Sequence, residues 1–160
     1  MIGVMAALAA CAESPAAPRS EVQVTVMRQT DTIRFSAPVT VARCAGRPGV
    51  LVEAIESSSG VLVWLRTADS TMAGTYRVVG MRDTISRPAA VVSVRFLSES
   101  VPYTVSLDSG TVATEDSAGA LRLRVQGSGL DVRGGTRPGV DAIFDALQAP
   151  NDSVTCVPGP

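Results

Sequence analysis

Apolar and polar residues alternate with a period of two along most of the chain. Val22, Val24 and Val26, for example, are separated by polar residues. This period places successive side chains on opposite faces of a β-strand. We predict strands over residues 22–26, 32–35, 50–56, 61–66, 75–81, 89–97, 103–107, 111–114 and 121–125. Glycine, proline, serine and aspartate clusters between them predict turns at residues 46–49, 57–60, 108–110 and 116–119, with glycine-rich breaks at 127–129 and 134–135.

Residues 61–66 differ from the other predicted strands because both faces are apolar. Val61, Val63 and Leu65 lie on one face, and Leu62 and Trp64 lie on the other. A strand of this kind is typical of the centre of a sheet that is covered on both sides.

These elements predict an all-β protein, with about nine or ten short strands and no long helix. Turn signals every 8 to 12 residues favour an antiparallel β-sandwich or barrel, and the pattern does not choose between them. The choice matters because a closed barrel can enclose a ligand, whereas a sandwich fills its interior with side chains. The 160-residue length fits a single β domain over residues 21–160.

The first twenty residues have a different character. An apolar run from Ile2 ends at Cys11, and residues 12–20 contain two prolines without apolar periodicity, as in a flexible linker. The stretch Leu8-Ala9-Ala10-Cys11 resembles the lipobox of bacterial lipoproteins. The resemblance implies that residues 1–11 are a signal peptide with its lipidation cysteine, and that Cys11 becomes the first residue of the mature protein.

Two properties of this leader qualify that interpretation. The apolar run has no positive charge before it, which indicates either a start upstream of Met1 or an unusual signal. The run is too short to span a bilayer, so we expect a lipid anchor. By analogy with enteric lipoproteins, Ala12 favours sorting to the outer membrane. The alternative is an ordinary buried N-terminal segment.

Residues 140–147 are ambiguous. Val140, Ile143, Phe144 and Leu147 have helical spacing, although eight residues are few for an uncapped helix. The last 50 or so residues, with their Gly-Thr-Val, Gly-rich turn, Ile-Phe-Asp-Ala and terminal Cys, resemble small bacterial lipoproteins. That resemblance implies a strand over residues 142–147, which we adopt.

The chain contains three cysteines. If Cys11 carries lipid, Cys44 and Cys156 remain as an even pair, which an exported protein can keep oxidised. We therefore predict a Cys44–Cys156 disulfide, with two unrelated buried thiols as the alternative. We expect no metal site, because the chain has no histidine and no paired-cysteine spacing.

Composition excludes most catalytic mechanisms. All fourteen positive charges are arginine, so histidine- or lysine-activated nucleophiles and Schiff bases are impossible within this chain. The carboxylate pairs Glu53/Glu56 and Glu115/Asp116 are interpreted as solvated strand ends. No nucleotide-binding glycine motif occurs, and a net charge of −1 argues against nucleic acid as a partner. We expect no catalytic residue and no cofactor.

Three sets of residues are candidates for binding. Five strand arginines are able to line one face for a phosphate or carboxylate, or else form a solvated face: Arg66, Arg77, Arg95, Arg122 and Arg124. Trp64, Tyr76 and Tyr103 form either a sugar-stacking platform or part of the core. Residues 67–74 form either a binding loop or an exposed connection.

Together these observations predict a lipid-anchored, extracytoplasmic protein of the cell envelope. Its expected role is non-catalytic, in binding or in structure, and its membrane partner is reached through the N-terminal lipid. The alternative is a lipocalin-like carrier of a small apolar ligand.

Overall fold

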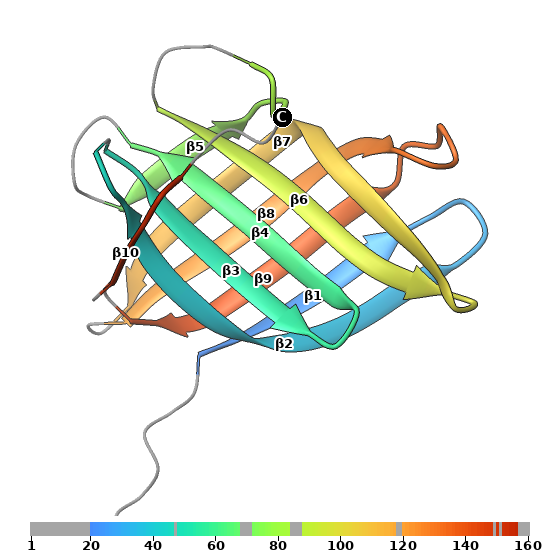
Figure 1. Ribbon diagram of the computed structural model, residues 1–160, viewed down its shortest axis with the longest axis horizontal. Coiled ribbons are helices and arrows are strands. Elements are labelled where there is room, and N and C mark those ends of the chain that lie inside the picture. Colours follow the sequence, from blue (N-terminus) through green and yellow to red (C-terminus); the bar gives the residue numbers. More distant parts are fainter. Residues whose placement is uncertain are drawn as a thin grey trace, which may run out of the picture.

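The computed structural model describes residues 20–46, 48–67, 72–83, 88–117, 120–148, 150 and 152–156, with backbone only at 116, 117 and 120. These residues form strands without any helix, and nine of the strands close into a β-barrel (Figure 1). The strands are β1 (Glu21–Met27), β2 (Thr32–Cys44), β3 (Val50–Glu56), β4 (Ser59–Arg66), β5 (Gly74–Val78), β6 (Ala89–Ser98), β7 (Val101–Ser117), β8 (Ala120–Asp131), β9 (Gly139–Leu147) and β10 (Asp152–Val154). The all-β prediction is confirmed, and the architecture is the barrel.

Eight strands form a ring in which every neighbouring pair is antiparallel. Its order is β1-β2-β3-β4-β6-β7-β8-β9, and β9 pairs with β1 to close it. Closure pairs the two outermost strands of the sheet with each other, and open edges of this kind otherwise attract further strands. Among the described residues there is no helix long and apolar enough to cross a membrane.

The ninth strand, β5, enters the ring at one end only. β6 and β7 pair directly where Ser98 meets Val101, but further along β5 lies between them, antiparallel to β7 and parallel to β6. The barrel therefore has eight strands at one end and nine at the other. We call these the narrow end, with the connections at 28–31, 99–100 and 132–138, and the wide end, with β5 and residues 45–49.

The interior is built from the alternation seen in the sequence. Val22, Val24 and Val26 of β1 are at most 1% exposed. Each of the remaining ring strands also contributes inward-facing residues to the same cluster. The largest fully buried side chains are Phe96, Phe144, Leu65, Leu107 and Leu123. These side chains belong to one connected apolar cluster, so the described interior is a packed core.

A second apolar cluster lies on the outside of the wall. This outer cluster consists of Cys44, Trp64, Val79, Ala89, Val91 and Cys156, with Leu51, Leu62 and Val154 packed against it. It covers the outer face of β4, and the core covers the inner face. The prediction that residues 61–66 are buried on both sides is confirmed.

The C-terminal segment, residues 152–156, lies along this outer cluster. β10 pairs in parallel with Ala42–Cys44 of β2, beyond the point at which β1 ends its pairing with Pro38. The predicted disulfide is present: Cys44 and Cys156 are bonded, with their Cα atoms 5.2 Å apart.

One predicted strand is longer than expected, and two predicted breaks proved wrong because the strands continue through them. The strand that begins at residue 32 runs on to residue 44 as β2. Residues 108–110 are not a turn but a bulge inside β7, where the register with β8 shifts between Leu107 and Ser109. The glycine-rich stretch 127–129 is likewise interior to β8, which runs on to Asp131.

The glycines at these positions serve close contact between strands. A Cβ atom at Gly129 would lie 2.0 Å from the Ser106 carbonyl oxygen, and one at Gly127 would lie 2.3 Å from the Ser109 carbonyl oxygen. No side chain fits there, so glycine lets the β7 and β8 backbones approach each other.

Two other local predictions are confirmed. Residues 50–66 form the antiparallel β3–β4 hairpin, in which Glu56 pairs with Ser59. The ambiguous residues 140–147 lie in strand β9, where Val140, Ala142, Phe144 and Leu147 point into the core. Ala146, in the left-handed region at φ 54°, shifts the alternation so that Leu147 is buried.

Candidate functional site

The five candidate arginines all lie on strands of the wall, and ion pairs occupy two of them. Arg122 Nε lies 2.9 Å from Asp145 Oδ1, and Arg124 Nη2 lies 3.1 Å from Asp141 Oδ2. Gln126 also donates to Asp141 Oδ2 at 3.1 Å. Together these residues form a charged ladder between β8 and β9, with half-exposed arginines.

The other three arginines are spread over the wall. Arg66 donates to the Asp83 carbonyl oxygen at 2.9 Å, and its guanidinium lies 5.7 Å from the Trp64 ring centroid. Arg77 is aligned with Arg66 across Ala89 of β6. Arg95 lies nearer the narrow end, opposite Gly60 and Thr104. The structure thus groups Arg122 with Arg124 and aligns Arg66 with Arg77, but it does not gather all five at one site.

The aromatic residues do not form a common platform. Trp64 belongs to the outer cluster, whereas Tyr76 is buried in the core at the wide end. Tyr103 lies at the narrow end, stacked on Phe96 with ring centroids 5.6 Å apart. The core interpretation holds for the two tyrosines.

The carboxylate pairs lie on strands β3 and β7. Glu53 lies on the outer phase of β3, and Glu56 lies three residues on, in the opposite phase of the pleat. Glu115 and Asp116 are adjacent in β7 and oppose Arg122 and Leu121. Glu53 and Glu56 therefore do not converge in the way that acid–base catalysis requires.

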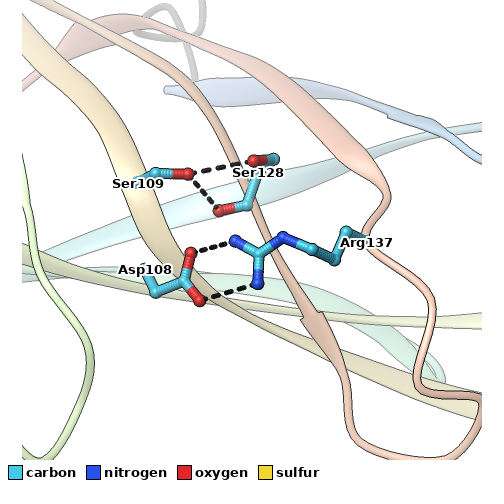
Figure 2. Close-up of polar contacts among 4 residues, drawn as sticks. All are labelled: Asp108, Ser109, Ser128 and Arg137. Carbon is cyan, nitrogen blue, oxygen red and sulfur yellow. Dashed lines mark hydrogen bonds and ion pairs between the residues drawn. The ribbon is translucent and has the colours of Figure 1, made fainter.

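The narrow end contains a polar cluster that the sequence reasoning missed. At the β7 bulge, Asp108 accepts two hydrogen bonds from the Arg137 guanidinium, and Arg137 Nη1 lies 3.0 Å from Asp108 Oδ2 (Figure 2). Beside this pair, the Ser109 hydroxyl lies 2.9 Å from that of Ser128. Hydrogen bonds from Arg137 hold the pKa of Asp108 below its ordinary value of 3.8, and the carboxylate raises the pKa of Arg137.

A recess of about 160 Å³ opens beside this cluster, between the β1–β2 and β8–β9 connections. The Arg28 guanidinium lies 4.5 Å from the Tyr103 ring centroid, and its Nε lies 3.4 Å from Asp31 Oδ1. Each arginine of the recess therefore has its own carboxylate. The Arg28 Nη1 atom is nevertheless buried without a hydrogen-bond partner among the described residues. Its lining residues are Arg28, Gln29, Thr30, Thr136, Arg137 and Pro138.

Asp131 holds the β8–β9 connection in place. It is 3% exposed, and its Oδ1 accepts the Arg133 backbone N–H at 3.0 Å. Its backbone N–H donates to Thr136 and its carbonyl accepts from Gly135. An aspartate that bonds the backbone two residues on is a turn signal. The Asp-Val-Arg-Gly-Gly sequence carries this signal, so it points to a structural role.

Two further predictions concern a metal site and the N-terminal leader. Among the residues that the structure describes, no group of three His, Cys, Asp or Glu side chains is arranged to hold a metal ion. Cys11, the rest of the predicted signal peptide and linker up to residue 19, and residues 68–71 of the candidate loop lie outside the described residues.

In comparisons with known proteins, no family model, curated protein or solved structure matches the chain.

Proposed function

We propose that this protein is a lipid-anchored β-barrel domain of the bacterial cell envelope, with a non-catalytic role in binding or structure. The observation that carries the proposal is the Cys44–Cys156 disulfide. Cytosolic thiols are kept reduced, so a disulfide of this kind is typical of an exported protein. The disulfide uses two of the three cysteines and leaves Cys11, the lipobox cysteine, for the anchor.

The placement of the charged residues supports the non-catalytic part of the proposal. Four described aspartates hold arginines or backbone groups: Asp145 and Asp141 in the ladder, Asp108 at the bulge and Asp131 in the connection. These groups stabilise strand pairing and loop geometry. A catalytic acid or base needs instead to face a site that substrate can occupy.

The closed antiparallel barrel is the observation that favours the second candidate, a lipocalin-like carrier of a small apolar ligand. A carrier needs an internal cavity of several hundred Å³. The described interior side chains instead pack into one cluster, which supports the first candidate over the second.

The anchor is tested by mass spectrometry of the mature protein made in a bacterium with an outer membrane. The expected N-terminal residue is Cys11, carrying acyl chains, and the protein fractionates with membranes. C11S is expected to retain the leader, take up no fatty-acid label and leave the membrane fraction. A12D is the matched control for sorting, since it keeps the lipid but is expected to shift the protein to the inner membrane.

An unmodified Cys11 in the wild-type protein, or cleavage at another residue, would refute the anchor. The carrier alternative has a separate readout. Saturable 1:1 binding of an apolar fluorescent probe, abolished by enlarging a core residue as in A142F, would favour the carrier. A probe that binds the wild-type and A142F proteins equally would show only surface adsorption.

A further inference from the structure

The C-terminal segment lies outside a barrel that closes without it. β1 pairs with β9 along one edge and with β2 along the other, and these two pairings complete the ring. β10 adds only to the part of β2 that β1 does not cover. Removing β10 therefore breaks no pairing within the ring.

The described backbone contacts of this segment are those of one short strand. Three residues of β10 pair in parallel with Ala42–Cys44, and the Ala45 N–H donates to the Val154 carbonyl oxygen at 2.8 Å. Ordering each residue costs backbone entropy, which so short a strand recovers poorly. The disulfide is consequently the main restraint on the segment.

The surface next to the disulfide is apolar and contains the one tryptophan of the chain. Trp64 is 9% exposed and belongs to the same outer cluster as Cys156. A Cβ atom at Gly49 would lie 3.2 Å from Trp64 Nε1 and 3.4 Å from Cys44 Sγ, so the indole and the disulfide face the same turn. Displacing Cys156 and Val154 would expose part of this cluster to water.

We propose that residues 152–156 form a redox-controlled strap, which the Cys44–Cys156 disulfide locks over the outer cluster and which a dithiol reductant releases while the barrel stays folded. In the reaction, the dithiol gives two electrons to the S–S bond. The bond breaks, Cys44 and Cys156 each gain a proton, and the dithiol becomes a disulfide. The released strap exposes the apolar side chains around Trp64 on the outer wall to water, and re-oxidation covers them again.

The test is reduction of the folded protein, using the full chain with Cys11→Ser so that only two thiols can form. Dithiothreitol is the probe, and hydrogen exchange and Trp64 fluorescence are followed without denaturant. Exchange of the Ala45 amide should become at least about tenfold faster, as expected for a local opening. Trp64 should become more accessible to acrylamide, whereas the amides of the β1–β9 pairing should still exchange far more slowly than the Ala45 amide, because the reduced barrel stays folded.

Two results would overturn the proposal. If both thiols react with a maleimide reagent but the Ala45 and Trp64 signals stay unchanged, the segment holds without the disulfide. If the Ala45 amide exchanges no faster than the β1–β9 amides after reduction, the segment opens only when the whole barrel unfolds, and the disulfide controls no strap. Because the protein is reduced after folding, no outcome depends on a variant that fails to fold, and re-oxidation should restore both signals.

Discussion

Across the outer wall of β8 and β9, arginines and aspartates pair within 2.9–3.1 Å and stay half exposed. Across β3, β4 and β6, the wall carries Leu51, Leu62, Trp64 and Val91, and the chain folds its own C-terminal segment against them. The charged side is complete when the ring closes, because water solvates it. The apolar side is covered by the C-terminal segment, and the disulfide fixes that segment in place. The charged side is stable in water without such a cover.

Removing the disulfide is expected to have the largest effect on stability. C44S combined with C156S opens a loop of 112 residues and should lower the free energy of unfolding by up to about 5 kcal/mol in the chain-entropy model. Equilibrium urea unfolding of the wild type and the double variant measures the difference. A loss below about 1 kcal/mol would mean that the apolar side is held without its covalent bond.

The backbone contact between β7 and β8 is the most sensitive point near the charged side. Gly129→Ala places a Cβ atom 2.0 Å from the Ser106 carbonyl oxygen and should cost about 3 kcal/mol of unfolding free energy. Thermal and urea unfolding measure the loss. Gly80→Ala is the matched control, because no atom lies within 4 Å of that Cβ position, and its effect should stay within about 0.5 kcal/mol. Equal effects of the two variants would disprove the close contact.

The charged ladder itself should contribute little. A double-mutant cycle of Arg122→Ala and Asp145→Ala is expected to give a coupling energy below about 1 kcal/mol, because both side chains are more than half exposed. The coupling should shrink as salt rises from about 0.05 M to 0.5 M, since mobile ions screen exposed charges. A coupling that salt leaves unchanged would indicate a buried contact and blur the contrast between the two sides.

The smallest expected effect is the pH dependence of the Asp108–Arg137 pair. Folding favours the ionised carboxylate and lowers its pKa below 3.8, so the pair contributes stability above about pH 4 and loses it as the pH falls through the folded-state pKa. NMR titration of the Asp108 carboxyl carbon measures this pKa. Arg137→Gln should raise it towards 3.8, and a pKa that does not change would show that Arg137 is not the cause.

Sequence reasoning predicted those parts of the fold that leave a local pattern in the residues. The alternation in residues 50–66 gave both the hairpin and the burial of Trp64 on the outer face. The Cys44–Cys156 pair followed from assigning Cys11 to the anchor. Local alternation does not predict which strands pair or in what register, because the partners lie far apart along the chain. For that reason the sandwich and the barrel could not be distinguished.

Glycine misled the prediction at Gly110, Gly127 and Gly129. Its freedom in turns and its small size at close contacts leave the same signature in a sequence, and only the facing strand shows which property is used. The Asp108–Arg137 pair was missed for a related reason. The two residues are 29 positions apart, and only the bulge in β7 brings them together.

The insertion of β5 has a geometric consequence for the whole barrel. One extra strand adds about 5 Å to the circumference, so the molecule is a funnel and not a cylinder. The wide end has more interior space for side chains to fill, and the inserted strand β5 itself contributes a large side chain there. Tyr76 points inward from β5, and its hydroxyl is tethered 3.2 Å from the Met72 carbonyl oxygen.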